Sequence, residues 1–132
     1  VLIDSARTVK WENDFEGRKV FSAAVGEKYI AVAGVALTKG AADARKSEVL
    51  IFNADGGQVG NYVVDREVFG LDVYGEIIAV NAGREIHILS PRGRSLWTYH
   101  AKSDIKEMKI LKSESDILVV TRDTVNVVPF TR

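Results

Sequence analysis

The residues able to carry metal or acid–base chemistry are few and scattered in this sequence. Its two histidines are His87 and His100, and cysteine is absent. A metal site needs a cluster of imidazole, thiolate or carboxylate ligands. The histidines fall in or beside two adjacent predicted strands, where half-exposed strand positions are the simpler interpretation. We therefore expect no bound metal.

A carboxylate pair and the serines are the remaining candidates for catalysis. Glu114 and Asp116 stand two apart before an apolar run, a pair that can do acid–base work or bind calcium. No third ligand or oxygen-rich loop is near them, so a solvated turn is favoured. No serine has a Gly-x-Ser-x-Gly context, and no glycine-rich phosphate loop occurs. We predict that the chain is not an enzyme and uses no cofactor.

The composition indicates one soluble domain spanning residues 1–132. Hydrophobic residues make up 46% of the chain, enough for a real core. The charges balance at 18 basic and 18 acidic residues, which argues against nucleic acid or an anionic membrane as partner. No apolar run approaches the roughly 20 residues of a membrane helix. The absence of cysteine fits a reducing compartment, and we expect a cytoplasmic location.

Most of the chain consists of copies of one strand unit. Second strands are predicted at 29–32, 77–80 and 117–120, which align without gaps, and third strands at 48–52, 85–89 and 124–128. Fourth strands are predicted at 58–63 and 95–99, while 1–4 and 8–13 match the back half of another unit. β-Branched and aromatic runs between Gly, Pro and Asn clusters are typical of antiparallel strands. The pattern predicts an all-β fold with two, four, four and three strands.

One segment departs from the repeat. The second strands are 40 residues apart from Val80 to Val120 but 48 apart from Val32 to Val80. The excess lies in residues 35–47, which we predict to be a long loop with 41–46 as its best helix candidate. Extra loop length costs little stability. The loop is a candidate for contacting a partner.

The best copy, residues 75–100, is similar to the repeats of β-propellers. Ile86-His87-Ile88-Leu89, Arg92-Gly93 and Leu96-Trp97 resemble the quinoprotein-type (PQQ-like) repeat, with an apolar strand, a glycine turn and Leu-Trp. The resemblance implies four-stranded blades, as also in WD-like propellers, although the Gly-His and Trp-Asp pairs of WD repeats are absent. Gly60 stands where Trp97 is expected. The matched positions of Trp11 and Trp97 favour blade packing over ligand binding.

About three blades cannot close a ring, because propellers usually have four to eight. The chain is therefore expected to be part of a larger propeller, or to combine with a second copy into a six-bladed homodimer. A small barrel or sandwich is the third possibility. The missing fourth strand of the last unit favours sharing of strands, since an open edge invites pairing.

Function is expected at the end where fourth strands lead to first strands and second strands lead to third. The loops there carry an excess of basic residues, which we predict to contact a partner: Arg18, Lys19, Lys39, Arg45, Lys46, Arg66, Arg84 and Arg122. Scattered solubilising charge is the simpler interpretation. We predict a non-catalytic protein-interaction or scaffold module whose partner is another protein or a second copy. A carbohydrate- or small-ligand-binding propeller, or a fragment of a propeller enzyme, are the alternatives.

Overall fold

The chain folds into antiparallel β-strands. The computed structural model describes the backbone of residues 2–3, 9–11, 19–38 and 41–130, and the side chains of residues 19–35 and 46–130. The strands are β1 (Leu2–Ile3), β2 (Val9–Trp11), β3 (Val20–Val25), β4 (Tyr29–Thr38), β5 (Ala41–Asn53), β6 (Gln58–Val64), β7 (Gly70–Tyr74), β8 (Ile77–Asn81), β9 (Glu85–Leu89), β10 (Ser95–His100), β11 (Ile105–Ile110), β12 (Asp116–Thr121) and β13 (Val125–Pro129).

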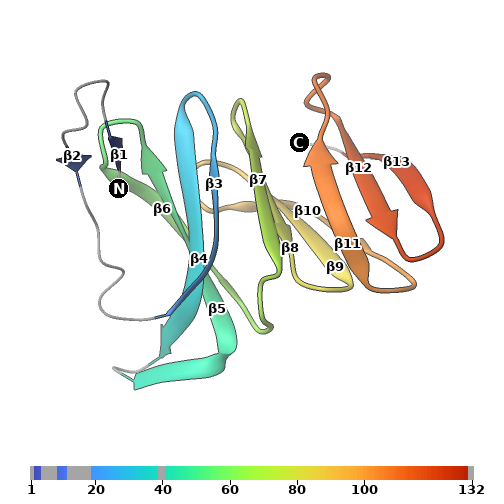
Figure 1. Cartoon of the computed structure of the whole chain (residues 1–132), viewed down its shortest axis with the longest axis horizontal. Coiled ribbons are helices and arrows are strands. Elements are labelled where there is room, and N and C mark those ends of the chain that lie inside the picture. Colours follow the sequence, from blue (N-terminus) through green and yellow to red (C-terminus); the bar gives the residue numbers. More distant parts are fainter. Residues whose placement is uncertain (1, 4–8, 12–18, 39–40, 131–132) are drawn as a thin grey trace.

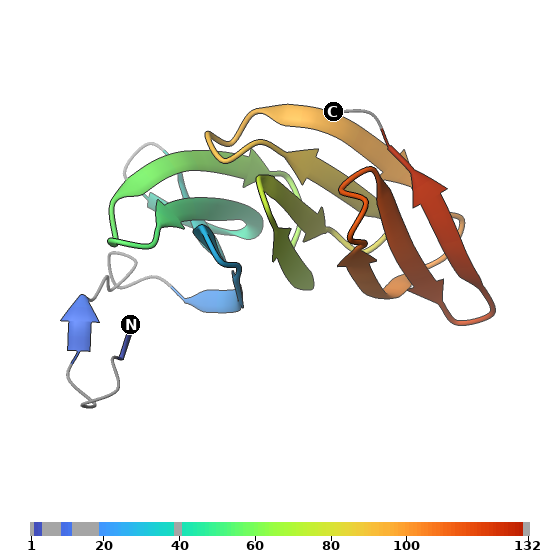
Figure 2. The ribbon, with the colours of Figure 1, turned by 90° about the horizontal axis from the view of Figure 1, so that it is seen from above.

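Strands that follow each other in sequence pair with each other, so each sheet is a simple meander (Figure 1). β3–β6 form blade 1, β7–β10 form blade 2 and β11–β13 form blade 3, while β1 and β2 form a separate two-stranded sheet. The predicted grouping of two, four, four and three strands is confirmed. Figure 2 shows the three blades following one another, with blade 3 at the far end from the N-terminus.

Glycine turns close the hairpins where the sequence predicts them. Gly56 and Gly93, at matched places in blades 1 and 2, have φ values of 89° and 84°. This left-handed conformation is accessible to glycine without strain. In the first turn the side chain of Asn53 also accepts hydrogen bonds from the backbone N–H groups of Asp55 and Gly57, at 3.0 and 2.9 Å. These contacts fix the register of β5 with β6.

The main core lies between the blades. Each blade has an onward face, turned to the next blade in chain order, and a back face. The onward face of blade 1 packs on the back face of blade 2 and includes Ala31, Ala33, Val49 and Ile51. The onward face of blade 2 packs on the back face of blade 3 and includes Ile77, Ala79, Ile86 and Ile88. These eight side chains are at most 1% exposed. Aliphatic contacts therefore hold the blades together, and the burial of this apolar surface favours the packing of one sheet on the next.

Trp97 takes part in the second of these cores. Its ring stacks on Tyr99 at 5.8 Å between centroids and lies 5.9 Å from the ring of Phe130, which follows β13. The blade-packing role predicted for Trp97 is confirmed. The side chain of Trp11 lies outside the described residues.

The predicted gapless alignment of residues 117–120, in the second strand of blade 3, with residues 77–80, in the second strand of blade 2, is wrong by one residue. In blade 2, Ile78 and Val80 lie on the back face, packed toward blade 1. In blade 3, the back face carries Ile117 and Val119. Ile117 therefore takes the place of Ile78 rather than Ile77. The longer β11–β12 turn makes this possible, since Ile110 pairs with Ile117 whereas Val73 pairs with Ile78.

The described residues of the predicted loop, 35–38 and 41–47, are strand, and 41–46 is not helical. β4 continues to Thr38 and β5 begins at Ala41, so the segment is a hairpin that prolongs both strands. Val35 pairs with Ser47 and Ala36 with Asp43, which leaves residues 44–46 as a bulge. The bulge breaks the period-2 pattern from which strands are recognised in sequence.

Candidate functional site

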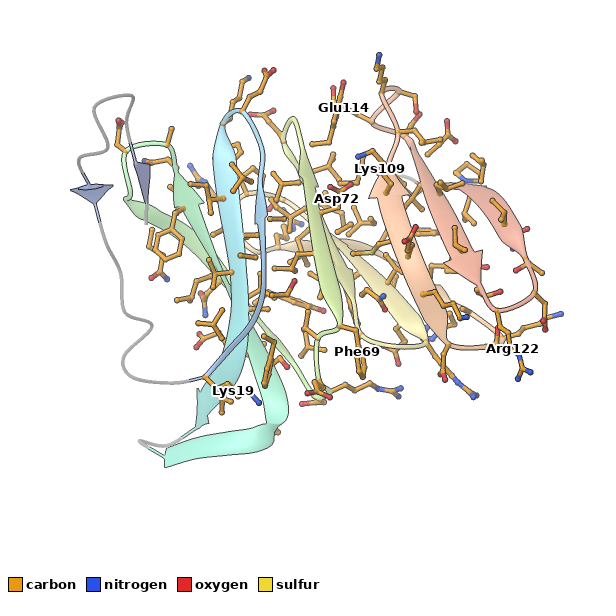
Figure 3. All side chains as sticks on the ribbon, viewed as in Figure 1. Lys19, Phe69, Asp72, Lys109, Glu114 and Arg122 are labelled. Atoms are coloured by element: carbon orange, nitrogen blue, oxygen red, sulfur yellow. The ribbon has the colours of Figure 1, made fainter. Side chains whose placement is uncertain are left out.

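The loop end is the end of the array built by four connections: β6–β7, β8–β9, β10–β11 and β12–β13. In Figure 3, Lys19, Phe69 and Arg122 lie at this end, whereas Glu114 lies at the opposite end. Lys19 precedes β3 of blade 1, Arg84 lies between β8 and β9 of blade 2, and Arg122 lies between β12 and β13 of blade 3. All three are exposed. The fold thus brings predicted basic residues from three blades to one end.

Carboxylates pair with several of the predicted basic residues. Arg84 Nε lies 3.0 Å from Asp104 Oδ1, and Arg66 Nη2 lies 3.1 Å from Glu85 Oε1. Lys46 Nζ lies 3.9 Å from Asp65 Oδ1. The acidic partners lower the excess positive charge of the loop end. The exposed pairs of Arg84 and Lys46 contribute only about 0–1 kcal/mol each, so a carboxylate of a partner can replace Asp104 or Asp65 there.

The structure describes no side chain for three of the predicted residues. Arg18 and Lys39 are not described, and for Arg45 the backbone in β5 is described but not the side chain. Lys19 is described, and its Nζ lies 6.0 Å from the ring centroid of Phe21. The predicted partner-binding set can therefore be placed in the structure only for five side chains: Lys19, Lys46, Arg66, Arg84 and Arg122.

Sequence reasoning missed an aromatic side chain at the loop end. Phe69, directly before β7, is 63% exposed. Its backbone N–H donates to the carbonyl of Asn81 at 2.8 Å, and its ring lies against Gly83, whose φ is 95°. Asn81 is buried and accepts a hydrogen bond from the N–H of Gly83 at 2.9 Å. The ring is thus supported from one side and open to solvent on the other.

A polar cluster lies between blades 1 and 2. The hydroxyl of Tyr62, on β6, is 3.0 Å from Nδ1 of His87, on β9. His87 Nε2 is 3.1 Å from Glu85 Oε2, and the two form an ion pair only when the imidazole is protonated. A cavity of about 240 Å³ opens beside the cluster and is also lined by Val63, Val64, Asp65 and Arg66.

His87 is more buried than the sequence suggests. Its side chain is 12% exposed, so the expected half-exposed position is wrong for this residue, while His100 is exposed. Burial lowers the pKa of His87 below its usual value, and the negative charge of Glu85 opposes the shift. Burial of His87 therefore favours the neutral form of its imidazole. No local sequence signal reveals this burial, because it follows from the contact of His87 with Tyr62 in the neighbouring blade.

Of the two neighbouring carboxylates, Glu114 lies in the β11–β12 turn and Asp116 is the first residue of β12. The Ser113 hydroxyl donates to Asp116 Oδ2 at 3.0 Å, and the Glu114 carboxylate lies against Gly75. Among the side chains that the structure describes, no group of three or more His, Asp or Glu residues is placed to hold a metal ion. The same part of the chain contains no helix long and apolar enough to cross a membrane.

The meander sheets and their face-to-face packing define a protein built of β-propeller blades. Residues 1–130 match the model of DUF5711, a family of unknown function, and the chain belongs to this family. No curated protein matches the sequence significantly.

Solved propellers are similar to this chain in fold. The crystal structure of HIRA(644-1017) has a TM-score of 0.63 at 13% identity, covering 83% of this chain and 34% of that one. The WD40 domain of Neurospora crassa Pan2 has a TM-score of 0.54 at 12% identity, covering 90% and 40%. The WD40 β-propeller of Doa1 has a TM-score of 0.51 at 10% identity, covering 85% and 51%.

The chain thus spans between about a third and a half of the propellers that it matches. At such identities the likeness shows the fold alone. The propeller architecture is confirmed, and the quinoprotein type of the repeat stays a prediction.

Proposed function

We propose that this chain is a non-catalytic protein-interaction and assembly module whose loop end contacts an acidic segment of a protein partner. The observation that carries the proposal is the meeting of exposed Lys19, Arg84 and Arg122, from three different blades, at one end of the array. Phe69 adds a supported, exposed aromatic ring to the same end. Aromatic and arginine side chains are the residues that dominate protein interfaces.

The chemistry of this end favours a partner with carboxylates beside an apolar side chain. A partner carboxylate can take over from Asp104 at Arg84, because the existing pair is exposed, with side chains 60% and 81% accessible. The ring of Phe69 offers apolar area without the loss of side-chain entropy that a long flexible residue would bring. Binding of this kind weakens with added salt, since exposed charges are screened.

The test uses a fluorescently labelled peptide of eight glutamates with a terminal phenylalanine. The protein is titrated into this peptide, and binding is followed by fluorescence anisotropy. Replacing Lys19, Arg84 and Arg122 with Glu together should weaken binding at least about tenfold. The matched control replaces Lys28, Arg92 and Lys112 with Glu. These residues are also exposed and lie in turns at the opposite end. Equal loss in both triple variants, or no binding by the wild type, would refute the loop end as the contact site.

A further inference from the structure

Three side chains between blades 1 and 2 follow one another as a hydroxyl, an imidazole and a carboxylate. The Tyr62 hydroxyl lies 3.0 Å from Nδ1 of His87, and Nε2 of the same ring lies 3.1 Å from Oε2 of Glu85. Glu85 and His87 are two residues apart on β9, so their side chains project from the same face of the strand. Tyr62 reaches His87 from β6 of the neighbouring blade. A hydroxyl, a base and a group that orients the base are the parts of an activated nucleophile.

The environment of His87 suits a base. Burial lowers the pKa of its imidazole, which favours the neutral form that can accept a proton. The Glu85 carboxylate opposes this shift and lies beside Nε2, where it stabilises the imidazolium once a proton has been taken up. The other carboxylate oxygen of Glu85 is held by Arg66, whose Nη2 is 3.1 Å from Oε1. A proton acceptor is therefore placed against the Tyr62 hydroxyl, with a negative charge behind it.

A reagent can approach this cluster from the cavity between the two blades. The cavity has a volume of about 240 Å³, and its lining includes Tyr62, Glu85, His87 and Arg66. At about 30 Å³ for each water molecule, this space corresponds to about eight waters, which suits a short acyl compound rather than a long chain. The guanidinium of Arg66 can donate to the oxygen that becomes negative when an acyl carbon is attacked.

The surroundings of Tyr62 set it apart from the other tyrosines. Of the hydrogen bonds between described residues, only that of Tyr62 joins a tyrosine hydroxyl to an imidazole. Tyr62 is half-buried, whereas the side chain of Tyr74 is 38% exposed. Accessibility alone would therefore make Tyr74 the faster of the two to react with a reagent in solution. Activation by His87 predicts the opposite order.

We propose that Tyr62 is a nucleophilic residue that is acylated by an activated short-chain acyl ester. The phenol oxygen of Tyr62 attacks the carbonyl carbon of the ester, and Nδ1 of His87 takes the phenol proton. The tetrahedral oxyanion then expels the alcohol part of the ester, which receives the proton from His87. The product is an O-acyl tyrosine. This modification goes beyond the proposed interaction function and does not depend on the loop-end contact.

The probe is p-nitrophenyl acetate, applied to the 132-residue chain at neutral pH. Each of the four tyrosines falls in a different tryptic peptide, so mass spectrometry of the digest gives a separate acetylation rate for each. Fragmentation of the peptides locates the acetyl group on the tyrosine. Acetylation of Tyr62 should be at least about tenfold faster than that of Tyr74. Equal rates, or faster acetylation of Tyr74, would overturn the proposal.

Two histidine variants test the base. His87→Gln should lower the acetylation rate of Tyr62 at least about tenfold, because an amide cannot take up the phenol proton, and should leave Tyr74 unaffected. The control, His100→Gln, alters the exposed histidine at the end of β10 and should leave both rates unchanged. Circular dichroism verifies that each variant is folded. A wild-type rate at Tyr62 in folded His87→Gln would show that the imidazole is not the base and overturn the proposal.

The pH dependence of the wild type gives a test that needs no variant. N-Acetyltyrosinamide, the reference, reacts as its phenolate, so its rate should rise about tenfold per pH unit between about pH 7 and 9. The rate of Tyr62 should already be level in this range, because burial lowers the pKa of His87 from 6.5 and the base is then neutral.

The groups around His87 define what else can affect this profile. Glu85, Arg66 and His100 act on its charge, Tyr62 is its hydrogen-bond partner, and Asp65 lines the same cavity. Of these groups, His100 is the other imidazole, so the profile is repeated with His100→Gln and should be unchanged. A rate at Tyr62 that rises with pH in parallel with N-acetyltyrosinamide would overturn the proposal.

Discussion

The hydroxyl of Tyr62, on the outer strand of blade 1, lies 3.0 Å from Nδ1 of His87 in blade 2. The two rings are 5.5 Å apart between centroids. With His87 neutral, Nδ1 can accept the hydroxyl proton of Tyr62, which places the imidazole proton on Nε2, facing Glu85. The contact between these blades thus contains a polar link beside its aliphatic core, and such links give a contact its specificity.

Stability should fall as the pH falls below the ordinary pKa of histidine. Burial lowers the pKa of His87 from 6.5, so the unfolded chain binds its proton first as the solution is acidified. The folded state then loses stability between pH 6.5 and the lower pKa of the folded state. Urea unfolding at several pH values should show this decline in the wild type, and His87→Gln should flatten it.

His100→Gln is the matched control for this pH dependence. The side chain of His100 is exposed at the end of β10, so its removal should leave the decline in place. Glu85, Arg66, His100 and Tyr62 are the charged or titratable groups around His87. An identical pH profile in wild type and His87→Gln would contradict the assignment.

Tyr62→Phe should lower the free energy of unfolding by about 1–2 kcal/mol. The change removes the hydroxyl and leaves Nδ1 of a mostly buried imidazole without its partner, which costs more than the mean value of a hydrogen bond. Tyr74→Phe serves as the control, because that ring is 38% exposed. Urea denaturation at pH 7.5 compares the two. Equal stability of the two variants would show that the Tyr62–His87 contact contributes nothing.

The strand order could be predicted from sequence because it depends on local residue patterns. The glycine turns at Gly56 and Gly93 and the apolar runs between them carry their own signals. The hairpin at 35–47 could not be recognised, since its bulge interrupts the alternation. Nor could the Tyr62–His87 link, because residues 25 apart meet only once the packing of two blades is fixed. The one-residue error at Ile117 has the same origin, since strand periodicity does not tell which face meets which blade.

Asp72→Ala should destabilise the junction between blades 2 and 3 by about 1.5–3 kcal/mol. Asp72 Oδ2 accepts a hydrogen bond of 2.7 Å from the backbone N–H of Ile110, which lies in the next blade. Removing the carboxylate leaves that donor unpaired in a partly buried site. Asp72→Asn keeps an acceptor oxygen and should recover most of the loss. Asp55→Ala, in an exposed hairpin turn, should leave the urea midpoint nearly unchanged, and an equal loss there would contradict this role.

Gly60→Ala should destabilise the fold because the β9–β10 turn of blade 2 lies directly against Gly60 of blade 1. A Cβ atom at position 60 would overlap the carbonyl of Pro91 and the main chain of Arg92. Backbone cannot yield as a flexible side chain can, so we expect a loss of about 1–3 kcal/mol. The same close approach explains why glycine stands here in place of the tryptophan of blade 2. Gly70→Ala is the control, since its Cβ would meet only the Cβ of Asn81 at 3.9 Å. Thermal unfolding of the two variants measures the difference, and equal midpoints would show that the turn can move away from β6.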